Sequence, residues 1–285
     1  MKVWVLGSAG LVGRCLVEFL RTMDVQVIAS DKKIVDITCF SELEKMFNEI
    51  KPDYIFNCAA YTAVDDAESS RELALAVNGI APGYLGKLTL STHCRVIHLS
   101  TDYVFSSENH IPFKEEDPTS PINYYGFTKL VGEKNLLKEN PNSCIVRTSW
   151  VFGPGGKNFI CSIANLLSSK EELQIAGDQI GRPTYCKDLV EALWDLKDFS
   201  GIFHFASSGS ASRYDIAVKI FEYMKQNHIP VLCKQIHNVS SKSFITKAPR
   251  PLYSVLDTTK YENYVHKVSR NWTETLKELF NEPKD

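Results

Sequence analysis

Short apolar segments alternate with amphipathic segments along the first two thirds of the chain. Five of the apolar segments have the length of a buried strand, namely residues 1–6, 25–30, 53–60, 95–100 and 144–148. Between them lie segments with helical periodicity, namely residues 14–23, 40–50 and 68–90, and a further helix that carries Tyr125. Pro82 predicts a kink in the third of these helices. The alternation predicts an α/β fold, a doubly wound parallel sheet (Rossmann) with helices on both faces.

The pattern becomes less regular after Phe152, and this change predicts a second structural unit. Helices are expected at residues 159–168, 214–227 and 272–280, with one more strand at residues 201–206. We therefore expect a Rossmann domain formed by residues 1–150 and 171–212. A smaller C-terminal substrate lobe would consist of residues 151–170 and 213–285. The site would lie between the two units, at the carboxyl edge of the sheet.

Three glycines follow the first strand at three-residue spacing, at positions 7, 10 and 13. In this context Gly7 permits a tight turn, Gly10 lets backbone N–H groups approach a pyrophosphate, and Gly13 lets the helix pack closely on the strand. Glycine-rich turns also serve purely structural purposes, so the spacing alone is only moderately specific. Asp31 ends the next strand about twenty residues later, where a carboxylate can accept hydrogen bonds from ribose hydroxyls. Together these features indicate a dinucleotide site.

The residues after Asp31 leave the choice of nicotinamide cofactor open. Asp31 favours NADH, because its carboxylate repels a 2′-phosphate. Lys32 and Lys33 follow directly and can neutralise such a phosphate, which favours NADPH.

Tyr125 and Lys129 stand four residues apart and so share one face of a helix. A neighbouring ammonium lowers the pKa of a phenol and makes it a better acid-base catalyst. On spacing alone, a surface tyrosine beside a solvated lysine is the more common explanation. The dinucleotide site earlier in the chain favours the catalytic interpretation.

Composition excludes several classes of protein. The chain has 285 residues, of which 44% are hydrophobic, so it can bury a large core. The net charge of −2 and the lack of long Lys/Arg runs argue against a nucleic acid polymer as partner. No apolar run approaches the ~18 residues needed to cross a membrane. The eight cysteines form no CxxC pairs, which is typical of reduced thiols and predicts a cytoplasmic protein.

Seven motifs, taken in order, resemble the extended short-chain dehydrogenase/reductases, and more closely the dTDP-4-dehydrorhamnose reductases. They are GSAGLVG (7–13), NCAAYTAVDDAE (57–68), STDYVF (100–105), SPINYYGFTKLVGE (120–133), RTSWVFGPGGKNF (147–159), DQIGRPTY (178–185) and APRPLYSVLDTTK (248–260). The resemblance covers essentially the whole chain. It implies reduction of the C4 ketone of dTDP-4-dehydro-6-deoxy-L-mannose with NADPH or NADH to give dTDP-L-rhamnose.

The resemblance also implies roles for single residues. Tyr125 matches the catalytic acid, Lys129 its partner, and Thr101 the hydroxyl that completes the triad. Matches to substrate-contacting positions are Thr101, Asp102, Tyr103, Trp150, Arg182 and Arg250. Trp150 is nearly as compatible with a role in filling the core, and the two arginines with surface positions.

The cofactor-binding residues expected from the glycine turn, the neighbouring loops and the tyrosine helix form a larger set. They are Gly7, Ala9, Gly10, Leu11, Val12, Gly13, Asp31, Lys32, Asp36, Ile37, Ala59, Ala60, Tyr61, Thr62, Asn78, Ser100, Tyr125 and Lys129.

The first turn of the first helix bears on metal binding. Some relatives hold Mg²⁺ at a subunit contact through acidic residues, one of them early in the first helix. Here that turn reads Arg14-Cys15-Leu16-Val17, which argues against a metal. A homodimer is compatible with the resemblance.

Two other functions share these motifs. A sugar-nucleotide 4-epimerase or dehydratase has the same glycines and the Tyr-Lys pair, but it retains its NAD through the cycle. The regulatory subunit of methionine adenosyltransferase has a similar fold and binds a dinucleotide without turnover. Thr101, Tyr125 and Lys129 are all present here, which favours an enzyme.

Overall fold

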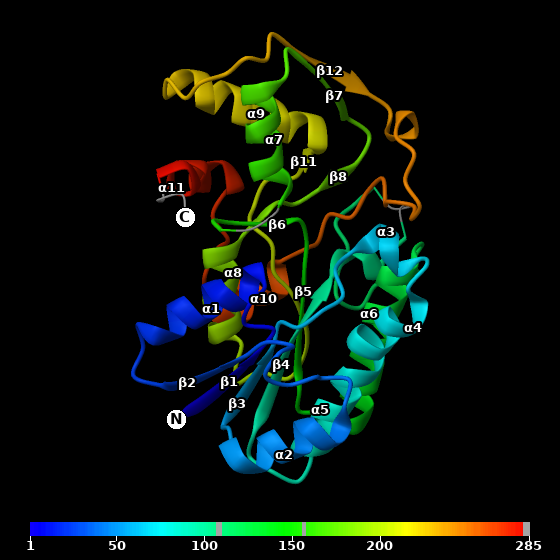
Figure 1. Ribbon diagram of the computed structural model, residues 1–285, viewed down its shortest axis with the longest axis vertical. Helices are drawn as coiled ribbons and strands as arrows, with labels where there is room; N and C mark the ends of the chain where they lie inside the picture. The colour runs from blue at the N-terminus through cyan, green and yellow to red at the C-terminus, as the bar shows by residue number, and fades with distance from the viewer. Residues whose placement is uncertain (107–109, 156–157, 282–285) are drawn as a thin grey trace.

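A computed structural model describes residues 1–106, 110–155 and 158–281 (Figure 1). Gly156 and Lys157 of the motif at 147–159 lie outside the described residues. All pairings in the central six-stranded sheet are parallel. Its strands lie in the order β10 (Gly201–His204), β5 (Cys144–Thr148), β4 (Arg95–Thr101), β3 (Tyr54–Asn57), β1 (Lys2–Leu6) and β2 (Gln26–Ser30). The expectation of a doubly wound α/β fold is confirmed.

The two faces of this sheet are covered by different helices, because successive side chains of a strand point to opposite faces. Val3 and Val5 pack with α1 (Leu11–Arg21) and α8 (Cys186–Asp195). Trp4 and Leu6 pack on the other face, in one apolar cluster with residues of three further helices. These are α2 (Phe40–Ile50), α5 (Ala81–Thr89) and α6 (Tyr124–Glu139).

A further apolar cluster forms the core of a smaller lobe, which lies above the sheet in Figure 1. Its elements are α7 (Phe159–Ser169), β7 (Glu172–Ala176), α9 (Arg213–Gln226), β12 (Gln235–Val239), the short helix η4 (Trp272–Thr275) and α11 (Leu276–Asn281). β7 and β12 pair in parallel. Two short pairs of two-residue strands lie where the chain passes between this lobe and the sheet. They are β6 (Val151–Phe152) with β9 (Thr184–Tyr185), and β8 (Ile180–Gly181) with β11 (Ala211–Ser212).

The packing refines the division expected from the sequence. β7 lies within residues 171–212, but its buried side chains belong to the core of the smaller lobe. Conversely, α10 (Thr259–Val265) packs with the sheet through Tyr261. With these two elements reassigned, the division into a Rossmann domain and a substrate lobe is retained as a proposal.

The helix expected at residues 68–90 runs from Arg71 to Thr89 and changes its winding before Pro82. It consists of α4 (Arg71–Leu75), a π-helical turn η1 (Ala76–Ile80) and α5, and the short helix α3 (Val64–Ala67) precedes it. Pro82 has no N–H for the carbonyl of Asn78, and its ring crowds that carbonyl. The wider π turn directly before α5 accommodates this crowding.

Two short helices follow strand ends, η2 (Asp102–Val104) after β4 and η3 (Ser241–Ser243) after β12. Within the described ranges, every helix is too short or too polar to cross a membrane.

Candidate active site

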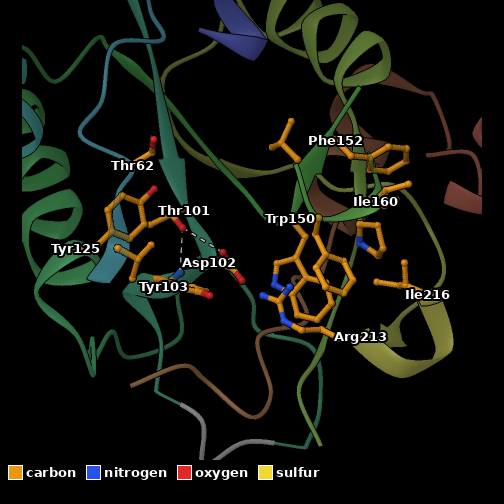
Figure 2. A pocket seen from close by; sticks show the side chains of 14 residues that line it. Thr62, Thr101, Asp102, Tyr103, Tyr125, Trp150, Phe152, Ile160, Arg213 and Ile216 are labelled. Carbon is orange, nitrogen blue, oxygen red and sulfur yellow. Dashed lines mark hydrogen bonds between the residues drawn. The ribbon is translucent and has the colours of Figure 1, made fainter. Parts of the chain in front are cut away.

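A continuous cleft runs along the carboxyl ends of the strands. One end is lined by the glycine turn and the Asp31 loop, and the middle by the end of β4 and by α6. The other end lies between α6 and the smaller lobe (Figure 2). Thr101, Asp102, Tyr125 and Trp150 line both the middle and this last part.

The glycine turn forms the floor of the first part. Gly7 has a φ of 76°, and a Cβ at this position would lie 2.6 Å from the backbone of Ala59. A side chain is therefore excluded by conformation and by space. The turn leads into α1, whose first turn contains no acidic residue. The N-terminus of this helix thus faces the cleft with the partial positive charge that suits a pyrophosphate.

Most of the predicted cofactor-binding residues line this cleft. Around the first part they are Gly7, Ala9, Gly10, Asp31, Lys32, Asp36, Ile37, Ala59, Ala60 and Tyr61; around the middle they include Leu11, Val12, Thr62, Ser100, Tyr125 and Lys129. Gly13 and Asn78 are not among the lining residues. The Asn78 side chain is buried and holds Tyr61 in place through its backbone N–H, at 2.8 Å, and its carbonyl, at 3.0 Å. Its contribution is therefore to position the loop.

Tyr125 is placed by close contact between α6 and η2. Asn123 caps the helix by accepting a hydrogen bond from the Gly126 N–H at 2.8 Å. A side chain on Gly126 would overlap the carbonyl oxygen of Tyr103, so glycine permits this approach. The rings of Tyr125 and Tyr103 then meet edge to face, with centroids 5.9 Å apart.

Burial raises the pKa of Tyr125 above its ordinary value, although the Thr101 hydroxyl, as a hydrogen-bond partner, offsets part of this effect. The phenol is therefore protonated, as a general acid must be. Thr101 itself donates to Asp102 Oδ1 at 3.1 Å and accepts from the Tyr103 N–H at 3.2 Å. Burial also raises the pKa of Asp102, to about 6.

Lys129 is buried one turn further along α6. Its Nζ donates to the Leu99 carbonyl at 2.6 Å and lies 3.3 Å from His98 Nε2. Burial lowers the pKa of Lys129 to about 8, and Glu133 opposes that change. The lowering of the Tyr125 pKa that we expected from Lys129 does not occur in this structure, because burial dominates the environment of the phenol.

The end of the cleft next to the smaller lobe is formed by both units. Asp102, Tyr103 and Trp150, for which the resemblance implies contact with substrate, line it opposite apolar residues of the smaller lobe. Trp150 has a φ of 45°, a left-handed conformation that is uncommon for a large side chain and that occurs at binding sites.

Arg213, at the start of α9, was not predicted from the sequence as a residue of this site. Its guanidinium lies 4.5 Å from the Trp150 ring centroid and 4.7 Å from that of Phe159. Its Nε donates to Gln179 Oε1 at 2.8 Å. Arg213 lines the pocket beside Asp102 and Tyr103, as Figure 2 shows. No local motif marks it, because its position depends on the packing of α9.

The two arginines that were predicted to contact substrate are not among the residues that line the pocket. Arg250 forms a 2.8 Å ion pair with Asp65 of α3. Arg182 donates to Thr258 Oγ1 at 3.2 Å. Arg250 belongs to a segment whose neighbouring Pro249 carbonyl accepts from the Asn123 side chain at 2.9 Å, so this segment lies against the start of the tyrosine helix.

The fold and the site together define the class of protein. A parallel sheet with a glycine turn after its first strand, and a Tyr-Lys pair on a helix that borders the same cleft, are the features of an extended short-chain dehydrogenase/reductase.

Comparison with known proteins identifies the family within this class. The model of the RmlD substrate binding domain family matches residues 1–284, and the chain belongs to this family. The spore coat polysaccharide biosynthesis protein SpsK of Bacillus subtilis is 37% identical over 284 residues, covering 99% of this chain and 97% of SpsK.

Two crystal structures are similar over nearly their whole length. A dTDP-4-dehydrorhamnose reductase from Clostridium acetobutylicum is 37% identical with a TM-score of 0.91, and 99% of each chain is covered. The dTDP-4-dehydrorhamnose reductase of Bacillus anthracis in complex with NADP is 33% identical with a TM-score of 0.92, and 98% of each chain is covered.

Proposed function

We propose that this protein reduces the C4 ketone of dTDP-4-dehydro-6-deoxy-L-mannose with NADPH or NADH to give dTDP-L-rhamnose. The observation that carries the proposal is the position of Thr101 and Tyr125. Both line the part of the cleft next to the glycine turn, and both also line the pocket between α6 and the smaller lobe that contains Trp150. A carbonyl held there would lie between the dinucleotide and the smaller lobe.

The eight free cysteines fit the reducing environment of the cytoplasm.

The residues of the cleft fit a nicotinamide dinucleotide. The glycine turn and the N-terminus of α1 would hold the pyrophosphate, and Asp31 with Lys32 and Lys33 would surround the adenosine ribose. Lys129 would meet the nicotinamide ribose. The cofactor, when bound, supplies the hydride that is transferred to C4.

The remaining chemistry belongs to the chain. Tyr125, kept protonated by burial, donates its proton to the C4 oxygen as negative charge develops there. The Thr101 hydroxyl, which donates to Asp102 Oδ1 in this structure, turns its proton toward the same oxygen and donates a hydrogen bond to it. Trp150 and Arg213 enclose the sugar and exclude water from the reacting atoms.

A direct assay tests this function. The purified protein is incubated with dTDP-4-dehydro-6-deoxy-L-mannose and NADPH or NADH, and the loss of reduced-nicotinamide absorbance is followed. We expect one nicotinamide oxidised for each dTDP-L-rhamnose formed, with the product identified by NMR. Conversion of a sugar nucleotide without net oxidation of added cofactor, by protein that retains bound nucleotide, would instead show an epimerase or dehydratase. Dinucleotide binding without any turnover would show a non-catalytic role such as that of the methionine adenosyltransferase regulatory subunit.

The choice between the two cofactors depends on the loop after β2. Asp31 Oδ1 accepts from the Lys33 N–H at 2.8 Å, which fixes the carboxylate at the edge of the cleft. Its repulsion of a 2′-phosphate is on the order of ~1 kcal/mol in a water-like dielectric, and the two exposed lysines oppose it. We therefore expect kcat/KM for NADH and NADPH to differ by no more than about tenfold.

Two variants test this balance through kcat/KM for both cofactors. Asp31→Ala is expected to shift the ratio toward NADPH, and the double variant Lys32→Ala/Lys33→Ala toward NADH. An unchanged ratio in both variants would show that this loop does not read the 2′ position.

Arg213 should govern substrate affinity. In Arg213→Lys the charge remains, but the planar stacking on Trp150 and Phe159 is lost, so the pocket is less well ordered. We expect KM for the sugar nucleotide to rise about tenfold, the scale of a lost cation–π contact in a desolvated site. KM for the nicotinamide cofactor serves as the internal control and should change little. A sugar-nucleotide KM equal to that of the wild type would contradict this role.

A further inference from the structure

Behind Lys129, two polar side chains lie in the interior of the sheet. Asn57 ends β3, and His98 occupies the paired position of β4. Each has only 1% of its surface exposed. A buried polar group must find its partners within the protein, so the hydrogen bonds of this pair determine where its protons are.

The proton positions follow from the backbone. Asn57 Oδ1 accepts from the Ala59 N–H at 3.2 Å, and this contact fixes the orientation of the amide. Asn57 Nδ2 therefore faces His98 Nδ1, at 3.0 Å, and donates to it. A neutral imidazole that accepts at Nδ1 carries its proton on Nε2. That Nε2–H points at Lys129 Nζ, 3.3 Å away.

The opposite arrangement creates a conflict. An ammonium on Lys129 that donates to Nε2 requires the imidazole proton on Nδ1. The amide of Asn57 would then have to turn its oxygen toward His98, which would place its NH₂ group against the Ala59 N–H. Two donors would face each other in a buried site, and neither would have an acceptor. His98 is also not charged, because burial lowers its pKa well below the ordinary value.

The other groups around Lys129 offer no uncommitted negative charge. On the same helix, Glu133 accepts from Arg147 at 2.9 and 2.7 Å and from the Ser100 hydroxyl at 2.5 Å. On the side of β3, burial raises the pKa of the Cys58 thiol to about 12, so this group is neutral. Tyr125, one turn before on α6, is neutral for the same reason. A charged Lys129 would face a donor from His98 and no free anion.

We propose that Asn57 and His98 are positioning residues that present a hydrogen-bond donor to Lys129 and shift its protonation equilibrium toward the neutral amine while no cofactor is bound. The neutral amine donates one proton to the Leu99 carbonyl and accepts the His98 Nε2–H at its lone pair. The charge of the lysine next to the catalytic tyrosine then depends on what occupies the cleft, since ribose hydroxyls can replace the Leu99 contact and accept from an ammonium. The inference uses the proposed function only in assigning Lys129 to the cofactor ribose.

The test is an NMR titration of the full-length protein without cofactor or substrate, so a failed reductase assay does not affect it. With ¹⁵N-histidine labelling, His98 is expected as the Nε2–H tautomer across neutral pH. With ¹³C-lysine labelling, the Cε resonance of Lys129, assigned by its loss in Lys129→Met, is expected to titrate at least about two pH units below the ordinary value near 10.4. An Nδ1–H tautomer, or a Lys129 midpoint near the ordinary value, would overturn the proposal.

Two variants separate the hydrogen-bond chain from burial. His98→Gln supplies an amide oxygen that can accept from an ammonium, and Asn57→Leu frees His98 to move its proton to Nδ1. Each is expected to raise the Lys129 midpoint by about one pH unit, a tenfold change in its dissociation constant.

Cys58→Ala is the matched control. Cys58 is a neutral neighbour of Lys129 that does not belong to the Asn57–His98 hydrogen-bond chain, so its replacement should leave the Lys129 midpoint nearly unchanged. An equal rise of the Lys129 midpoint in all three variants would show that hydration of the site, and not the hydrogen-bond chain, causes the rise. If His98→Gln and Asn57→Leu both fold, as thermal unfolding verifies, and both keep the wild-type Lys129 midpoint, then Asn57 and His98 only fill space. Both results would reject the proposal.

Discussion

Replacing Tyr125 with Phe is expected to lower kcat by about 10²-fold or more, the scale of a lost general acid. The substitution removes only the phenolic oxygen. The ring contact with Tyr103 and the packing of α6 are retained, so NADPH affinity should stay nearly the same. The measurements are single-turnover rates with the keto sugar and NADPH binding by fluorescence.

Tyr124→Phe is the matched control for this prediction. The Tyr124 ring packs against Phe127 and under the guanidinium of Arg71, on the outer side of the same helix. Tyr124 is not among the residues that line the cleft. Its kcat should equal that of the wild type. If Tyr125→Phe also turns over at the wild-type rate, Tyr125 is not the proton donor.

Replacing Arg147 with Met is expected to give the largest loss of stability, about 3–5 kcal/mol of the free energy of unfolding. Arg147 pairs with Glu133 at 2.7 Å, and the side chains are only 3% and 2% exposed. Its guanidinium also lies 5.0 Å from the Phe105 ring centroid. Removing it leaves the carboxylate of Glu133 buried, with the Ser100 hydroxyl as its remaining hydrogen-bond partner. Urea denaturation measures the effect.

The double variant Arg147→Met/Glu133→Leu shows whether the uncompensated charge is the cause. Since it removes both charges, it should recover a large part of the lost stability. Lys234→Met, which breaks an exposed pair with Glu171, is expected to change stability much less. A double variant that is less stable than Arg147→Met would instead assign the effect to packing.

Local features of the sequence predicted the helices and strands that line the first and middle parts of the cleft. The residue limits of α2 and β5 agree with those expected, and β1, β2 and β4 each differ by one residue at one end. Such agreement is expected where a periodic apolar pattern of helix or strand length is bounded by glycine, proline or a capping residue. The spacing of Tyr125 and Lys129 on one helix also needed no knowledge of the rest of the chain.

Contacts between distant segments were predicted less well. Arg250 was expected at the substrate, but it pairs with Asp65, 185 positions away in the sequence. Arg213 was not expected there, but it covers Trp150 because α9 packs on α7 in the smaller lobe. A guanidinium does line the pocket, but it belongs to Arg213 and not to either of the arginines named from the sequence.

The sequence by itself determined the doubly wound fold, the dinucleotide turn and the tyrosine helix, because each depends on residues within about one turn or one strand of each other. Only the tertiary structure decided which arginine reaches the pocket and how the protons of Asn57 and His98 are arranged behind Lys129. These features join strands and helices that are far apart in the sequence, and they are set by the packing of side chains and by the requirement that every buried polar group finds a partner. Periodicity shows which face of an element is buried, but it does not show what that face meets.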